Sequence, residues 1–225
     1  MSRRGGERLA EAIDWLSGVL VSERSSSGRP GWTLAIAALA LYAAYLISRA
    51  SFAAGGPDSS GYLNAARLFE SGRTRVVITP LRHLGIDSSF AGAFVPLGFA
   101  LGPRSGTMVP TYPPGLPIHF VAAAKVGGWT RGPFVVSPLA AAGCMMMMFA
   151  VGRQFGLSHA LATVGAVTLG FVPALVVHAL QPVSDVVATF WALVTIWCAM
   201  RAQSRPGYAA FAGVAFAVGV WVRPT

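Results

Sequence analysis

The chain has 225 residues, of which 54% are hydrophobic and only 11% are charged. Soluble globular proteins carry about 25% charged residues, so this composition excludes an ordinary cytosolic enzyme, and the high hydrophobicity excludes a disordered chain. The net charge is +9, and arginine supplies 16 of the 17 basic residues. Because these arginines gather in a tail and in loops between apolar runs, we expect them to contact lipid headgroups, and we expect no nucleic-acid partner.

Residues 1–31 form a polar tail that we expect on the cytoplasmic side of a membrane. Apolar side chains recur in it at helical spacing, at Leu9, Ile13, Leu16 and Leu20. This pattern is typical of a short amphipathic helix that lies on the inner leaflet, and the alternative is a helix packed on another protein subunit. The tail lacks the early apolar core of a cleavable signal peptide.

The first apolar run, 32–47, carries no charged residue and is closed by Arg49. With its apolar extension to Ala54 it reaches the roughly 20 residues that a helix needs to cross a bilayer. Five arginines precede the run, so the positive-inside rule places its N-terminal end in the cytoplasm.

A long polar loop, 49–132, follows, and we expect it to contain short juxtamembrane helices. Residues 57–72 predict one such helix, which Asp58 or Ser59 can cap at its start. Residues 76–78 have β-forming side chains, and the glycine, proline and serine around them predict an ordered loop.

Four later runs have the composition of further spans. They are 133–151, 160–180, 186–200 and 208–222. A helical stretch at 117–127 is too short to cross, and if it lies at the interface, Arg153, Arg201 and Arg205 fall in short cytoplasmic loops, as the positive-inside rule requires. We therefore predict an all-α, multi-pass protein of the inner (plasma) membrane with about five transmembrane helices, its N-terminus in the cytoplasm and its C-terminus outside. A sixth span over 117–127 is the alternative.

This topology collects polar side chains at the outer boundary of the membrane. They are Asp58, Tyr112 in a Tyr-Pro-Pro turn, His119, Asp185 and Arg223. Ionisable groups at membrane depth usually mark function, and within the predicted spans only His178 is of this kind. Polar groups concentrated at one rim predict binding or chemistry on an amphiphile there, whereas the scarcity of ionisable residues within the spans argues against an ion pump or a proton-coupled transporter.

Several of these residues also have a structural interpretation. Asp58 and Asp185 can cap helices, and Arg223 can anchor the last helix among headgroups. Cys144 and Cys198 lie in apolar runs without metal-ligand spacing, so we expect neither a metal site nor a cofactor. No G-x-S-x-G, P-loop or G-x-G-x-x-G motif occurs.

The order of four motifs resembles the N-terminal half of the GT-C glycosyltransferases that use polyprenyl-phosphate sugars. This superfamily includes the protein O-mannosyltransferases and the lipid A aminoarabinose transferases. The motifs here are Asp58 with Tyr62, Tyr112-Pro113-Pro114, Ser184-Asp185 and Arg223-Pro224. In the family they correspond to an acidic helix that opens the first outer loop, a Tyr-Pro-Pro turn, a Ser-Asp pair that starts a span, and an Arg-Pro pair after the next span. The resemblance covers about residues 32–225 as one transmembrane module.

The resemblance implies that Asp58 is the catalytic base or positions the acceptor. A carboxylate can take the proton of an acceptor hydroxyl as its oxygen attacks the anomeric carbon. The resemblance also implies that Tyr62, Tyr112, Asp185 and Arg223 bind substrate, with Arg223 facing the lipid phosphate that leaves. The expected partners are a polyprenyl-phosphate lipid and the membrane lipids.

Two departures from the family pattern leave a second function open. Ser59 stands where the family often has a second acid, and family members are usually much longer chains. The sequence is then expected to be either part of a longer enzyme or a shortened relative. A shortened relative would be a non-catalytic accessory subunit, docked on other membrane subunits of a larger complex of, for example, respiratory or photosynthetic type.

Overall fold

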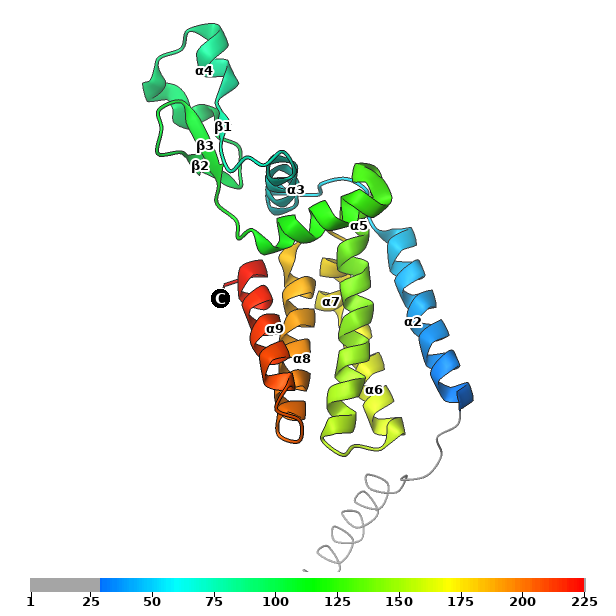
Figure 1. The fold of residues 1–225 in the computed structure, drawn as a ribbon. Coiled ribbons are helices and arrows are strands. Elements are labelled where there is room, and N and C mark those ends of the chain that lie inside the picture. Colours follow the sequence, from blue (N-terminus) through cyan, green and yellow to red (C-terminus); the bar gives the residue numbers. More distant parts are fainter. Residues whose placement is uncertain (1–28, 225) are drawn as a thin grey trace, which may run out of the picture.

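In the computed structural model, which describes residues 29–224, helices occupy all five apolar runs that the sequence predicts as spans (Figure 1). They are α2 (Arg29–Arg49), the second part of α5 (Gly115–Gln154), α6 (His159–Gly170) with α7 (Pro173–Ala179), α8 (Ser184–Ala202) and α9 (Tyr208–Val222). The predicted helical class is confirmed for this bundle. The amphipathic helix predicted for the tail falls on residues 1–28, which lie outside the described part of the chain.

The helices of the bundle differ in their capacity to cross a membrane. Among the described residues, α5 and α8 are each long and apolar enough to do so alone. α6 and α7 meet this condition only together, as one span bent by 58°. α9 and the stretch Ala35–Arg49 of α2 are apolar but shorter. The structure therefore gives two or three membrane-spanning candidates, and five spans remain a prediction.

The helix α5 is divided by an elbow at Gly128. This residue has φ 70° and ψ 167°, a conformation that favours glycine and interrupts the helix. The part before the elbow lies across one end of the bundle, and the part after it runs along the bundle (Figure 1). The predicted short helix at 117–127 thus has the transverse orientation that an interfacial helix requires.

A second interruption, between α6 and α7, is stabilised from another helix. Pro173 has no N–H, and the helical hydrogen bonds break at this point. The carbonyl of Gly170 accepts a hydrogen bond of 2.6 Å from the hydroxyl of Tyr42 on α2, and the Tyr42 ring meets Phe171 edge-on. A free carbonyl inside an apolar bundle is costly, so this contact lets the helix bend.

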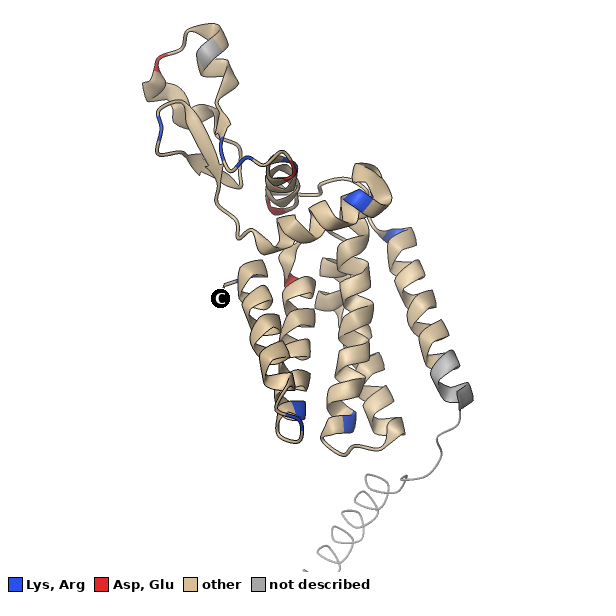
Figure 2. Ribbon diagram, in the orientation of Figure 1, with Lys and Arg blue, Asp and Glu red and all other residues tan. Residues whose placement is uncertain are grey.

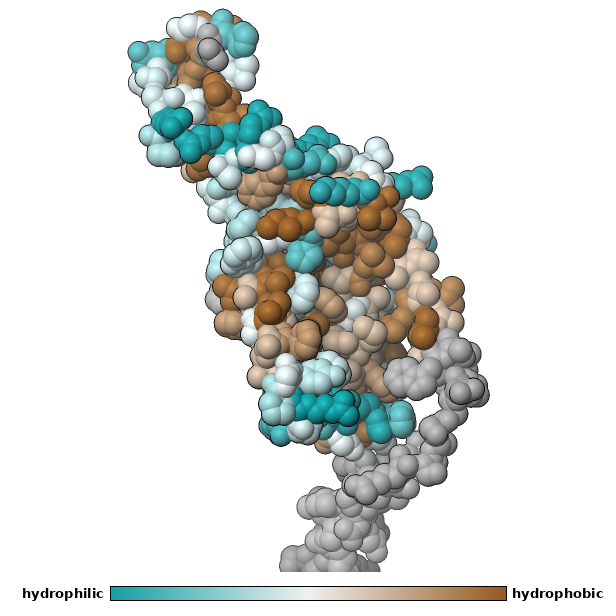
Figure 3. All heavy atoms as spheres, in the orientation of Figure 1, coloured by the Kyte–Doolittle hydropathy of each residue, from teal (hydrophilic) through white to brown (hydrophobic). Residues whose placement is uncertain are grey.

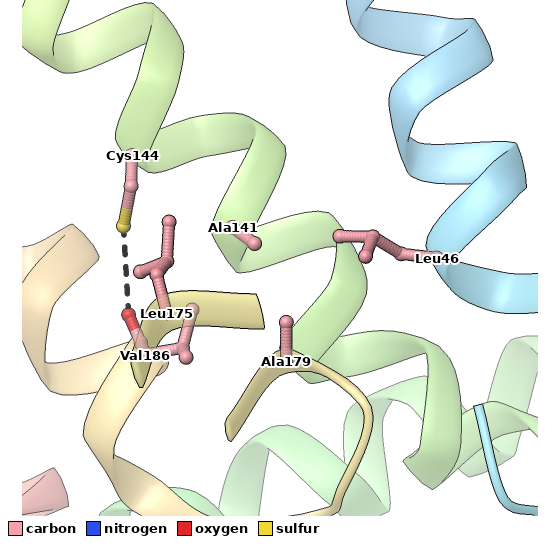
Figure 4. Packing of buried hydrophobic residues seen from close by; sticks show 6 residues of the cluster. All are labelled: Leu46, Ala141, Cys144, Leu175, Ala179 and Val186. Carbon is pink, nitrogen blue, oxygen red and sulfur yellow. Dashed lines mark hydrogen bonds between the residues drawn. The ribbon is translucent and has the colours of Figure 1, made fainter. Parts of the chain in front are cut away.

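The middle of the bundle packs through small and aliphatic side chains (Figure 4). The buried cluster there draws on α2, α5, α7 and α8, and consists of Leu46, Ala141, Cys144, Leu175, Ala179 and Val186. The fully buried Ala141 and Ala179 let the helices approach closely. The thiol of Cys144 donates a weak hydrogen bond to the carbonyl of Val186 at 3.6 Å. The cysteines are free and buried, as expected of packing residues.

Beyond the end of the bundle that carries the transverse part of α5, the chain forms a small sheet (Figure 1). The antiparallel strands lie in the order β1 (Val76–Val77), β3 (Thr107–Pro110), β2 (Phe99–Leu101), with the short helices α4 (Thr79–Leu84) and η1 (Ser88–Phe94) beside them. Ile78, Leu81 and Ala91 form its core. The β-forming patch at 76–78 contributes only β1, and the ordered loop that we predicted here also contains β2 and β3, because the three strands pair over a long stretch of sequence.

Charge is confined to the ends of the bundle. Figure 2 shows no charged residue along the middle of the described helices, and Figure 3 shows a largely apolar belt between two hydrophilic ends. Arg153 and Arg201 lie in the last turns of α5 and α8, at the end away from the sheet. Large apolar side chains such as Ile36, Val164 and Phe211 are exposed on the belt. Such a surface is typical of a protein that contacts lipid.

Replacement of Tyr42 tests the stabilisation of the bent helix. Tyr42→Phe is expected to lower the free energy of unfolding by about 1 kcal/mol, because the Gly170 carbonyl loses its hydroxyl donor. Tyr45→Phe is the matched control, since Tyr45 is an exposed ring on the same helix. Thermal unfolding of the purified protein in detergent measures both. Equal midpoints for the two variants would contradict the role given to Tyr42.

Candidate functional site

The site is built where α3 (Pro57–Glu70) lies against the transverse part of α5 at the end of the bundle. A buried group that we name the α3–α5 cluster joins four helices there: Tyr62, Ala66, Leu116, Phe120, Val187 and Val222. Gly115 lets α5 cross the end of α9, because a Cβ at this position would lie 2.5 Å from backbone atoms of Trp221 and Val222. These contacts bring the starts of α3, α5 and α8 close to the end of α9.

Asp58 lies in the first turn of α3 as an exposed carboxylate. The predicted capping role of Asp58 or Ser59 was wrong, because Gly56 is the N-cap residue and no side chain caps the helix. The start is instead set by Pro57, whose missing N–H suits the first turn. Asp58 Oδ1 accepts a hydrogen bond of 2.5 Å from the Tyr112 hydroxyl. The structure thus joins two of the predicted site residues that lie 54 positions apart.

This contact changes the acidity of the tyrosine. The hydrogen bond to Asp58 raises the pKa of Tyr112 to about 12, with smaller contributions from burial and from the Asp58 charge. Tyr112 therefore stays protonated, and stays a hydrogen-bond donor to Asp58, at every physiological pH.

Tyr62 connects this pair to α8. Its ring stacks on that of Tyr112 with centroids 4.6 Å apart, and its hydroxyl donates a hydrogen bond of 3.1 Å to the buried Ser184. Burial raises the pKa of Tyr62, and the charges of Asp58, Asp185 and Arg223 also act on it. Tyr62 is therefore linked to each of the other predicted site residues, by ring stacking to Tyr112 and through the charges of Asp58, Asp185 and Arg223.

Asp185 and Arg223 form an ion pair across the ends of α8 and α9. Arg223 Nη1 lies 2.6 Å from Asp185 Oδ1, and the two side chains are 44% and 36% exposed. The predicted capping role of Asp185 was wrong, because Val183 is the N-cap residue and no side chain caps α8. A partly exposed pair of this kind adds at most about 1 kcal/mol to stability. The Arg223 guanidinium keeps further N–H groups with which it can bind a phosphate.

His119 lies at the same end but is fully engaged in structure. Its Nδ1 is 2.7 Å from the carbonyl of Gly115, and its Nε2 accepts a hydrogen bond of 3.1 Å from the Trp191 indole N–H. This arrangement matches a neutral ring with the proton on Nδ1. His119 therefore fastens the transverse part of α5 to α8.

The contacts of Trp129 with Glu70 and Arg67 at this end were not anticipated from the sequence. At the elbow, the Trp129 indole N–H donates a hydrogen bond of 2.9 Å to Glu70, and the Arg67 guanidinium lies over the Trp129 ring at 5.5 Å. These contacts tie the end of α3 to α5. No group of three or more histidine, cysteine and acidic side chains that could hold a metal ion occurs in the described part of the chain.

Comparisons with known proteins returned nothing. No family model matches the chain, and no curated protein or solved structure matches it. The resemblance to the GT-C glycosyltransferases therefore remains an expectation that rests on the four sequence motifs.

The acidity of Tyr112 provides a direct test of its contact with Asp58. In an alkaline titration followed by tyrosinate absorbance, one of the five tyrosines is expected to ionise near pH 12, and Asp58→Asn should return it toward the ordinary value of 10.0. Because the folded-state pKa is raised, the stability that the contact contributes is complete below pH 10.0 and is lost as the pH rises through about 12. Tyr112→Phe, which removes the transition near pH 12, identifies the residue. A late tyrosine that survives in Asp58→Asn would contradict the assignment.

Proposed function

We propose that this chain is a GT-C-type membrane glycosyltransferase module, which transfers a sugar from a polyprenyl-phosphate donor to a hydroxyl group at the outer face of the membrane. One observation carries the proposal: an exposed carboxylate, Asp58, is held by Tyr112 at the apolar rim of the bundle, close to the Asp185–Arg223 pair. A base and a phosphate-binding cation beside a lipid-facing surface suit an amphiphilic sugar donor.

In the proposed reaction Asp58 acts as the general base. The acceptor oxygen attacks the anomeric carbon of the sugar, and Asp58 takes the proton of that hydroxyl. The bond between the anomeric carbon and the phosphate oxygen breaks, and polyprenyl phosphate leaves with the bonding electrons. A general base of this kind contributes roughly 10²- to 10⁴-fold to the rate.

Arg223 is proposed to receive the negative charge of the leaving phosphate. It lies directly after α9, where the apolar surface meets water. Exposed apolar side chains on α9, namely Phe216, Val220 and Trp221, provide a surface for the polyprenyl chain below it. The guanidinium can donate to phosphate while Asp185 keeps it in place.

The proposal includes the five-span topology, with Asp58 outside and Arg153, Arg201 and Arg205 in the cytoplasm. These arginines lie at the end of the bundle opposite to the sheet, so the positive-inside rule supports this orientation.

Cysteine labelling tests the orientation. Ser105→Cys places an exposed thiol in the sheet segment, by which we mean residues 76–110, and Ser204→Cys places one in the turn between α8 and α9. The native Cys144 and Cys198 are buried. A membrane-impermeant maleimide should label the first variant in intact spheroplasts and the second only after lysis. The opposite pattern, or equal labelling of the two, would refute this topology.

Substitution of Asp58 tests the chemistry. In the longest native form of the protein, Asp58→Asn should lower transfer by at least about 100-fold, because the amide cannot take a proton. Asp87→Asn is the control, since Asp87 is an exposed acid in the sheet segment. The assay uses the protein in proteoliposomes, a panel of polyprenyl-phosphate sugars as donors and native membrane extract as acceptor. Release of polyprenyl phosphate measures the rate of transfer from each donor.

A second candidate function, a non-catalytic subunit of a membrane complex, is favoured by the surface of the sheet segment. Leu84, Phe90 and Leu97 are 70%, 63% and 71% exposed there, beyond the end of the bundle. Such side chains are suited to docking on another protein. Wild-type protein that releases no polyprenyl phosphate and purifies in mild detergent with a stoichiometric partner would favour this function over transfer.

A further inference from the structure

The ring of Tyr112 lies in a slot where two glycine backbones meet. A Cβ at Gly61, in α3, would collide with the Tyr112 ring, reaching 2.8 Å from its Cδ2. A Cβ at Gly98, which directly precedes β2, would lie 2.7 Å from Tyr112 Cε2 and equally close to the Gly61 Cα. Two separate segments thus lack side chains at the place where this one ring lies.

The third side of the slot is the ring of Tyr62. It stacks on Tyr112 and is itself held by Ser184 at the start of α8. Gly98 has φ +86°, so its own conformation favours glycine. Its carbonyl accepts a hydrogen bond of 3.0 Å from the N–H of Thr111, the residue before Tyr112. The ring is therefore fixed by α3, by α8 and by the sheet segment together.

The fixed ring determines how Asp58 can act. Tyr112 donates its hydrogen bond to Oδ1, and Oδ2 has no hydrogen-bond partner among the groups that the structure describes. Asp58 is exposed, so a carboxylate without this contact would rotate freely in water. With it, one oxygen is held and the other is left to accept a proton.

We infer that Tyr112 is a positioning residue for Asp58, and that the Gly61–Gly98 slot sets the position of its hydroxyl. This role rests on the proposed function, because it concerns the base of that reaction. It differs from the substrate contact that the family resemblance implies for Tyr112. It also makes the sheet segment part of the site. Gly98 directly precedes β2 and contacts the Tyr112 ring, so the position of the sheet affects the tyrosine that holds Asp58.

The first experiment tests the slot without any substrate. Gly61→Ala should push the Tyr112 ring away from Asp58, so that the late tyrosine of the alkaline titration returns toward pH 10.0. Alanine has a higher helix propensity than glycine, so the substitution does not destabilise the helix itself. Gly165→Ala, in α6 and with nothing near its Cβ, is the matched control and should leave the titration unchanged. An unchanged titration in Gly61→Ala would overturn the slot.

The second experiment tests positioning in the longest native form, with the same polyprenyl-phosphate release assay. Tyr112→Phe keeps the ring in the slot but removes the hydroxyl, and it should lower kcat about tenfold with KM unchanged, the size expected for one hydrogen bond. Gly61→Ala should have a similar effect, and the double variant should be no slower than the slower single variant, because both changes act through one hydroxyl.

The outcomes separate the two claims. If Gly61→Ala changes the tyrosine titration but neither the wild-type protein nor any variant releases polyprenyl phosphate, the proposed function is wrong and the slot is confirmed. Normal kcat in Tyr112→Phe, or effects of Gly61→Ala and Tyr112→Phe that multiply, would overturn the positioning role while transfer itself stands.

Discussion

The packing of α3 and the transverse part of α5 on the end of the bundle holds the remaining parts of the site in place. Leu116 and Phe120 are fully buried in the α3–α5 cluster, and Gly115 brings the α5 backbone against that of α9. Asp58, Tyr112 and Arg223 lie on segments that cannot meet unless this crossing forms. A site made of short helices and loop ends thereby acquires the rigidity of a helical core.

The location of the site follows from the cost of polar groups in an apolar surrounding. The bundle keeps charge out of its middle, and at the break between α6 and α7 the Tyr42 hydroxyl satisfies the carbonyl of Gly170. The residues of the proposed site therefore lie at a rim of the bundle. In the proposed function, the tail of an amphiphile lies against the exposed apolar belt, and its headgroup meets Asp58 and Arg223 at the rim near the sheet.

The sequence predicted the helices well because each apolar run is a local signal. It also predicted that Asp58, Tyr112, Asp185 and Arg223 share one end, since topology alone fixes the end of a helix at which a residue lies. The contacts between these residues could not be predicted from the sequence. The pairing of β1 with β3 joins segments about 30 residues apart along the chain, and a two-residue strand such as Val76–Val77 has no periodicity to recognise. The capping role of Asp58 or Ser59 failed for a local reason that was visible, the proline at the first position of α3.

The difference between the two acids of the site follows from their partners and not from their positions in the sequence. Asp58 and Asp185 both lie in the first turn of a helix, and the sequence gives them the same two interpretations. In the structure the charge of Asp185 is compensated by Arg223, whereas the hydrogen-bond partner of Asp58, within the described part of the chain, is the neutral hydroxyl of Tyr112. A carboxylate paired with guanidinium serves to orient that cation, while one that is held by a neutral donor and exposed to water remains able to accept a proton. In the proposed reaction, proton transfer is therefore assigned to Asp58, and the orientation of Arg223 is assigned to Asp185.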